Sequence, residues 1–214
     1  TYADEMTNFA NWYTYYRSRM KMMKTAAGRA FSSVDDTYRV GFITICPVSG
    51  NDCQSSAMGS SVVAAKYLRI ADYDATHRAN WYTKLYAQSP SNFTPLREAL
   101  SRVGLIYAGK FGSGLTGGLS AASDDPVTAS CQPNFAILST DGYWNGNVGR
   151  QIDNSTSVGN QDNTDTAPYS RQSDGVYDGG TPVASNALAD VALYYYKTDL
   201  RPAMANTVPT TAKD

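Results

Sequence analysis

The sequence predicts an α/β fold in which a central sheet lies between helices, with long loops joining some of the elements. Three observations support this fold. Helical periodicity recurs along the chain, short runs rich in β-branched and aromatic residues lie between the helical stretches, and two segments without periodicity are too long to be simple connections. The expected order is helix, strand, strand, helix, helix, strand, long loop and helix.

Residues 2–31 have the most regular apolar spacing in the chain, and they predict one long amphipathic helix. Apolar side chains recur at alternating intervals of three and four residues: Met6, Phe9, Tyr13, Tyr16, Met20, Met23, Ala27 and Ala30. Such a stripe of methionine and aromatic residues is typical of a packing face rather than of a cofactor site.

Two strands and a helix are expected next. Residues 38–45 and the run from Val62 to Ile70 read as strands, and the turn-rich stretch between them favours an antiparallel pair. A helix over residues 75–88 follows, with Asp74 as its N-cap. His77, in the first turn of that helix, is expected to be solvated or bonded locally.

Thr94 and Pro95 predict the start of another helix, which runs through Ile106, because threonine is a good N-cap and proline suits the first helical position. Residues 112–130 are rich in Gly, Ser and Ala, and they read as a surface loop insertion.

The short apolar run of residues 135–139 is expected to be a buried central strand that ends at Thr140-Asp141-Gly142. Residues 143–183 form the second loop insertion, and loops of that length usually have a function or hold ions. A final helix is expected over residues 186–198, with Leu188, Val191, Ala192 and Tyr195 on its buried stripe.

Composition excludes several functional classes. The net charge is −1 and charged residues make up 17% of the chain, so no electrostatic argument for binding nucleic acid or an anionic membrane exists. The sequence contains no run of 18 apolar residues, so it predicts no membrane-spanning helix. The 16 tyrosines suit an extracellular contact surface, and the start at Thr1 suits a mature, exported product.

Three cysteines are present. Cys46 and Cys53 flank a short loop of turn-forming residues that a disulfide could close; the alternative is two free thiols. Cys131 is then left over. With His77 as the one histidine and no C-x-x-C motif, a Cys/His metal site is not expected.

The motifs of common enzyme classes are absent. The sequence has no G-x-S-x-G elbow, no P-loop and no G-x-G-x-x-G after a strand, and its glycine pairs at 112–118 follow a helix. No pair of acidic residues stands out as a general acid and base. We therefore expect no catalytic activity.

Two short motifs supply oxygen ligands. Thr94 places a hydroxyl at a helix start, and Asp141 places a carboxylate after the predicted buried strand. Converging at one sheet edge, these groups would suit Mg²⁺, Mn²⁺ or Ca²⁺. Each has a purely structural alternative, since Thr94 can cap its helix and Asp141 can stabilise a turn.

At these motifs the sequence resembles von Willebrand factor A domains, whose metal-ion-dependent adhesion site has similar second and third elements. Several blocks are also similar to the amino-terminal domain of PilY- and PilC-type type IV pilus-tip adhesins. The blocks are residues 5–13 with Tyr15-Tyr16-Arg17, Arg39-Val40-Gly41-Phe42, Asn134 to Gly146, Leu188 to Ala192, and Asp199-Leu200-Arg201-Pro202.

The resemblance implies a von Willebrand factor A-like domain of a secreted protein of Gram-negative bacteria. The protein would lie at the pilus tip on the cell surface, contact minor pilins, and promote pilus assembly and adhesion to a host or abiotic receptor. A carboxy-terminal propeller with a calcium site, found in the family, has no counterpart in this chain.

The chain departs from the family pattern at both ends. The first element of the adhesion site, a strand ending in D-x-S-x-S, is expected before Thr1, and the last strands are expected after Asp214, so residues 1–214 read as one incomplete domain. Asp153-Asn154-Ser155-Thr156-Ser157 matches D-x-S-x-S by letter, but it follows no buried strand and precedes no helix, so we expect a coincidence. The oxygen-rich run at 162–165 lacks EF-hand features and reads as a solvated turn.

The sequence therefore predicts a non-enzymatic pilus-tip adhesin in which Thr94 and Asp141 bind a divalent cation in the intact domain, and bind it weakly or not at all in this fragment. One alternative is a structural assembly factor that contacts minor pilins without a metal or a receptor. The other is a secreted hydrolase that uses carboxylates of the 143–183 loop.

Overall fold

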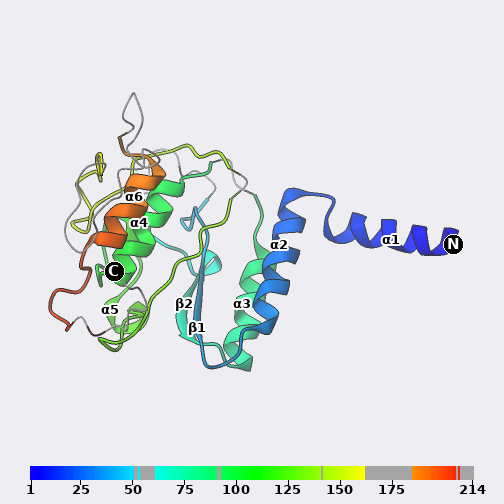
Figure 1. Ribbon diagram of the computed structural model, residues 1–214, viewed down its shortest axis with the longest axis horizontal. Helices are drawn as coiled ribbons and strands as arrows, with labels where there is room; N and C mark the ends of the chain where they lie inside the picture. The colour runs from blue at the N-terminus through cyan, green and yellow to red at the C-terminus, as the bar shows by residue number, and fades with distance from the viewer. Residues whose placement is uncertain are drawn as a thin grey trace, which may run out of the picture. The chain divides into compact units, whose positions relative to one another are not determined.

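The computed structural model describes residues 1–50, 53, 61–90, 93–140, 142–161, 185–205 and 207. The chain forms two compact units, one of residues Thr1–Ile43 and Ala64–Ser91, the other of Thr44–Val63 and Asn92–Asp214. Figure 1 labels their elements.

The first unit begins with two helices rather than one. Helix α1 spans Tyr2–Tyr15 and α2 spans Arg19–Ala30, followed by a short 3-10 turn, η1, at Phe31–Ser33. The prediction of one continuous helix over 2–31 is wrong because Ser18 has extended backbone angles and its hydroxyl accepts a hydrogen bond from the Lys21 N–H as the N-cap of α2.

Strand β1, Arg39–Ile43, pairs antiparallel with β2, Tyr67–Asp72, which confirms the predicted hairpin direction. The second strand begins later than predicted, because residues Ala64–Lys66 form a 3-10 turn, η3, and Val62 makes only an isolated bridge with Val48. These two strands are the sheet of the described residues. The larger sheet between helices therefore stays a prediction.

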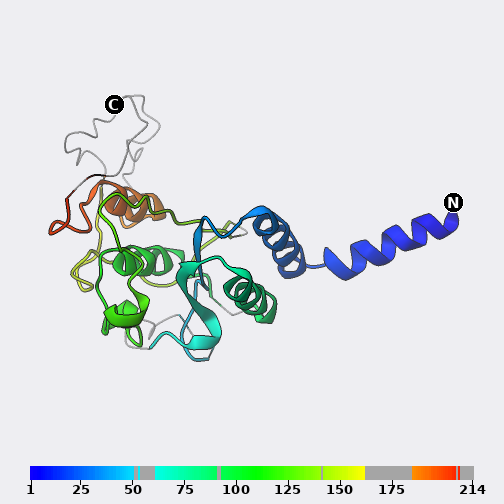
Figure 2. The same ribbon diagram turned by 90° about the horizontal axis from the view of Figure 1, so that it is seen from below.

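Helix α3, Ala75–Ala87, confirms the predicted helix and its cap, since the Asp74 carboxylate accepts from the His77 N–H at 2.7 Å. It lies beside α2 on one face of the hairpin (Figure 2). Trp81 is the centre of the core: its ring stacks on Phe31 with centroids 4.5 Å apart and meets Tyr73 edge-on. Aromatic packing of this kind stabilises a core beyond the area it buries.

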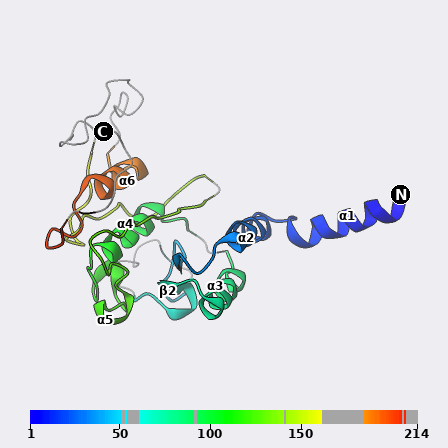
Figure 3. The ribbon, with the colours of Figure 1, turned by 60° about the horizontal axis from the view of Figure 1, so that its bottom comes forward.

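The second unit is organised around helix α4, Leu96–Tyr107, which packs against helix α6, Leu188–Lys197 (Figures 1 and 3). Gly104 allows the close approach, because a Cβ at this position would lie only 2.1 Å from the Tyr195 ring. The two helices confirm the predicted helical segments after residues 94 and 186.

Residues 112–130 are only partly the surface loop that the sequence predicts. They contain the 3-10 turn η4, Gly114–Thr116, and the short helix α5, Ala121–Asp124. Leu115 and Thr116 are fully buried. Because the carbonyl of Leu115 accepts a hydrogen bond from a buried arginine of α4, this segment belongs to the core of the unit.

Residues 135–139 are not the buried strand that the sequence predicts. They have no regular secondary structure, and the side chains of Phe135 and Ile137 are 79% and 82% exposed. An apolar run becomes a central strand only when neighbouring strands satisfy its backbone, and within the described residues no strand pairs with it.

Candidate functional site

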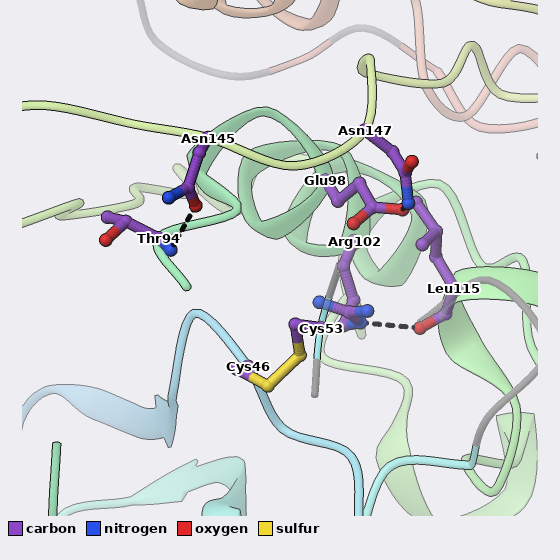
Figure 4. The surroundings of a disulfide bond; sticks show 8 residues. All are labelled: Cys46, Cys53, Thr94, Glu98, Arg102, Leu115, Asn145 and Asn147. Atoms are coloured by element: carbon purple, nitrogen blue, oxygen red, sulfur yellow. Dashed lines mark hydrogen bonds between the residues drawn. A yellow bond between two sulfur atoms is a disulfide. The ribbon is translucent and has the colours of Figure 1, made fainter. Parts of the chain in front are cut away.

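Thr94 is the first of the two predicted site residues, and it lies just before α4. It is hydrogen-bonded to Asn145, in the segment that follows the other predicted residue, Asp141. Its backbone N–H donates to the Asn145 Oδ1 at 2.7 Å, and the Asn145 N–H donates back to the Thr94 carbonyl at 3.1 Å (Figure 4). Asp141, the second predicted residue, lies outside the described residues. Asn145, four residues farther on, thus connects the two motif-bearing segments.

Thr94 is not the N-cap that the sequence predicts. The cap position is Pro95, which offers no side-chain hydrogen bond, and the helix begins one residue later at Leu96. The Thr94 carbonyl accepts hydrogen bonds from the N–H groups of Leu96 and Asn145 instead. The residue is therefore fixed through its backbone by the 145 segment.

The segment after Asn145 continues along α4 through side-chain contacts. Arg97 donates to the Gly146 carbonyl at 2.7 Å, and the Asn147 side-chain amide donates to Glu98 at 3.2 Å (Figure 4 shows the second pair). We refer to these contacts, together with the Thr94–Asn145 pair, as the α4 clasp. It holds a loop without regular secondary structure against one face of the helix.

After residue 147 the loop also makes hydrogen bonds to α4 and α6. The Arg150 N–H donates to the Ser101 hydroxyl at 2.8 Å, and the Tyr195 hydroxyl of α6 donates to the Arg150 carbonyl at 2.7 Å. Residues 145–150 are therefore anchored by both α4 and α6.

A buried charged pair lies directly beneath the clasp. Glu98 and Arg102, one helical turn apart, are 0% and 1% exposed. Burial raises the pKa of the Glu98 carboxyl, and burial lowers the pKa of the Arg102 guanidinium to about 10, although the nearby Glu98 acts in the opposite direction. Arg102 Nε donates to the Leu115 carbonyl at 2.6 Å, whereas both Arg102 Nη atoms and Glu98 Oε2 are buried without a partner.

The Cys46–Cys53 pair forms a disulfide, which settles the choice that the sequence leaves open (Figure 4). Both cysteines are buried and cluster with Val48. Cys131 is exposed and free. A disulfide of this kind persists in oxidising compartments.

A groove of about 540 Å³ lies between α4, α6 and the segments that flank them. Val103, Tyr107, Tyr195 and Met204 are among its lining residues. The hydroxyl group of Tyr107 in this groove donates an internal hydrogen bond to the Phe135 carbonyl at 2.8 Å. The groove thus offers mainly apolar surface.

The letter match to D-x-S-x-S forms a self-contained turn. Asp153 Oδ1 accepts from the N–H groups of Ser155 and Thr156 at 2.9 Å each, and the Thr156 hydroxyl donates to Oδ2. These bonds, led by the Thr156 hydroxyl, lower the pKa of Asp153 to about 2. The turn accounts for this carboxylate without a metal. The predicted solvated turn at 162–165 lies outside the described residues.

Within the part of the chain that the structure describes, no group of three or more His, Cys, Asp or Glu side chains is placed to hold a metal ion. His77 Nε2 is 2.8 Å from the Val40 carbonyl of β1, so the prediction of a solvated or locally bonded side chain is wrong: the histidine contacts a residue 37 positions earlier. Since Asp141 lies outside the described residues, the predicted cation site stays a prediction.

Sequence reasoning missed the residues that build the clasp. Asn145 belongs to a block that is noted only for its resemblance, and nothing in its neighbourhood predicts a bond to a residue 51 positions earlier. The sequence contains one sign of the buried charged residues: Glu98 and Arg102 have the i, i+4 spacing of an ion pair on one helix face. That spacing is usually found at the surface, so it does not predict burial.

Comparison with known proteins gives one consistent relationship. The chain is 35% identical over 203 residues to a type IV pilus biogenesis factor, PilY1, of Pseudomonas aeruginosa strain PAK, and 35% identical over 208 residues to PilY1 of strain UCBPP-PA14. PilY1 of strain PAO1 is 34% identical over 211 residues. These alignments cover 93–94% of this chain but only 15–16% of each relative, so the chain spans about a sixth of their length.

No family model matches the chain, and no solved structure matches it either. Among the described residues, no helix is both long and apolar enough to cross a membrane. The relationship to the pilus proteins therefore rests on sequence identity along nearly the whole chain.

Proposed function

Because this chain is related to the PilY1-type pilus biogenesis factors over 94% of its length, we propose that it acts in the biogenesis of type IV pili as part of a longer protein. That identity is the observation that carries the proposal. The buried Cys46–Cys53 disulfide supports a place outside the cytoplasm, at the cell surface or the pilus.

The finer proposal is that the segment belongs to a von Willebrand factor A-like adhesion domain that contacts minor pilins and a surface receptor. The clasp supports it, because Asn145 joins the helix start at Thr94 to the loop that begins at Asp141. In this proposal Thr94 and Asp141 contribute oxygen ligands to a divalent cation, and further ligands come from outside the described residues.

Asp141→Ala in the full-length protein tests the finer proposal. We expect normal pilus numbers, loss of adhesion to a surface, and loss of any rise in melting temperature when Mg²⁺, Mn²⁺ or Ca²⁺ is added. Asp153→Ala is the matched control, because Asp153 lies in the look-alike motif and its oxygens are used by its own turn.

Two outcomes separate the alternatives. If Asp141→Ala abolishes piliation, the segment is an assembly factor rather than an adhesion module. If none of the three cations changes the melting temperature of the unaltered protein, the cation site is wrong, and the role in pilus biogenesis stands without it.

A further inference from the structure

Two aromatic side chains next to the clasp are presented to solvent. Tyr143 is 93% exposed and Trp144 is 45% exposed, although both belong to the loop that the clasp fixes. Residues 142–149 contain no charged side chain. The tip of the loop is therefore aromatic and uncharged.

The clasp begins immediately after this pair. Asn145 makes two hydrogen bonds to Thr94, and the carbonyl of Gly146 accepts from Arg97 at 2.7 Å. Gly146 itself is needed for the path of the chain, since its φ is +93° and a Cβ would lie 3.2 Å from Pro95. The backbone that directly follows the aromatic pair is thus held by hydrogen bonds to α4 and the residues before it.

An exposed aromatic pair next to an anchored backbone is an efficient binding element. Tryptophan and tyrosine are the residues most often found at energetic hot spots of protein interfaces, and they lose little conformational freedom on binding. A preformed loop also avoids the entropic cost of ordering. The lack of basic residues at the tip argues against nucleic acid or an anionic membrane as the partner.

We propose that Tyr143 and Trp144, pre-organised by the α4 clasp, are the contact through which this chain docks into an uncharged apolar pocket on a protein of the pilus. Asn145 is the positioning residue of this contact. The inference rests on the proposed role in pilus biogenesis, and it specifies the surface that carries out that role.

Binding of the full-length protein to purified pili tests the proposal. The pili are sheared from piliated bacteria and washed free of bound full-length protein, so its docking sites are vacant. We expect the Tyr143→Ala/Trp144→Ala double variant to bind at least about tenfold more weakly than the unaltered protein. The control is Phe135→Ala, which removes another exposed aromatic side chain, 79% in solvent, from the same unit and should bind as the unaltered protein does.

Variants of Asn145 test the positioning role of this residue independently. Asn145→Ala removes the acceptor for the Thr94 N–H and should weaken binding while the aromatic side chains remain. Asn145→Asp keeps a side-chain oxygen at that position and should restore most of the binding. Circular dichroism and thermal melting of each variant verify that the fold is retained.

Three results would overturn the inference: unchanged binding by the double variant, equal weakening by Phe135→Ala, or competition by free monosaccharides, which would make the ligand a glycan. A separate measurement, of piliation, tests the proposed role in pilus biogenesis. If deleting residues 1–214 from the full-length protein leaves piliation normal, the biogenesis role itself is wrong. If that deletion stops piliation while the double variant still binds, only the docking contact is wrong.

Discussion

Helices α1 and α4 show how differently two amphipathic helices of one chain can be used. The apolar side chains of α1 follow helical spacing, yet α1 contains no buried residue, and Phe9 is 56% exposed. Helix α4 is buried along most of its length, and its buried face includes the charged side chains of Glu98 and Arg102.

The difference teaches that periodicity identifies the face of a helix that can be covered, not whether something covers it. In α4 the cover is supplied by α6, the 145–150 segment and the η4 turn, all of which come later in the sequence. Burial then follows from these neighbours, and it includes polar residues that the neighbours can bond.

The largest effect is expected at the buried charge of α4. Arg102→Met should lower the free energy of unfolding by about 3 kcal/mol or more, because the buried Leu115 carbonyl loses its donor and the buried Glu98 loses one of the three arginines that favour its charged form. Urea unfolding measures the change. Arg17→Met, at the end of α1, is the control: Arg17 lies over the exposed Tyr13 ring at 4.3 Å, and its loss should cost no more than about 1 kcal/mol. Equal losses would contradict the contrast between the two helices.

Truncating one apolar side chain in each helix compares their packing directly. Leu105→Ala removes a fully buried side chain of α4 and should cost about 3 kcal/mol, including the cavity that it leaves. Phe9→Ala in α1 should change stability by less than about 0.5 kcal/mol, since Phe9 is largely in solvent. A large loss from Phe9→Ala would show that α1 is covered in solution.

The change of the unfolding free energy with pH reports the effect of burying Glu98. Its pKa is raised by burial, so the folded state binds this proton more tightly than the unfolded chain, whose carboxyl titrates near 4.5. The stabilisation is fully present below that pH and is lost as the pH rises through the raised pKa. Glu98→Gln cannot ionise, and its unfolding free energy should therefore fall less between about pH 4 and pH 8 than that of the unaltered chain. Parallel curves for the two proteins would show that Glu98 does not carry this dependence.

The smallest effect is expected at the break between α1 and α2. Ser18→Ala removes the hydroxyl that caps α2 and should cost about 1 kcal/mol in thermal or urea unfolding. Ser33→Ala, in the turn after α2, is a matched control. If helicity measured by far-ultraviolet circular dichroism rises in Ser18→Ala, the two helices have merged, and the cap is the main cause of the break.

Local signals in the sequence predicted part of this structure well. The β1–β2 hairpin and the start of α3 at Asp74 depend on neighbouring residues, so strand propensity and a capping side chain were sufficient. The break at Ser18 was hidden because the apolar stripe continues through it. Residues 135–139 show the opposite error, since a strand requires partners that its own composition cannot reveal.

The candidate site was less predictable for a related reason. The sequence predicts Thr94 as the N-cap of its helix, whereas the cap position is Pro95 and Thr94 contacts Asn145, far along the chain. Contacts of this kind depend on how loops return to helices, and residue type alone does not encode the return path. The resemblance of the two motifs to an adhesion site is the signal in the sequence that links Thr94 to the segment of Asp141.

The division into two units has a practical consequence for dissecting the molecule. The chain crosses between the units after Ile43, after Val63 and after Ser91. No single cut can release one unit intact, and a truncation that removes residues 1–43 also removes β1 and leaves β2 without its partner. A protease nick at one crossing leaves two covalent tethers in place. Fragments for functional work should therefore be designed by closing each unit with a new loop or by circular permutation rather than by trimming from either end.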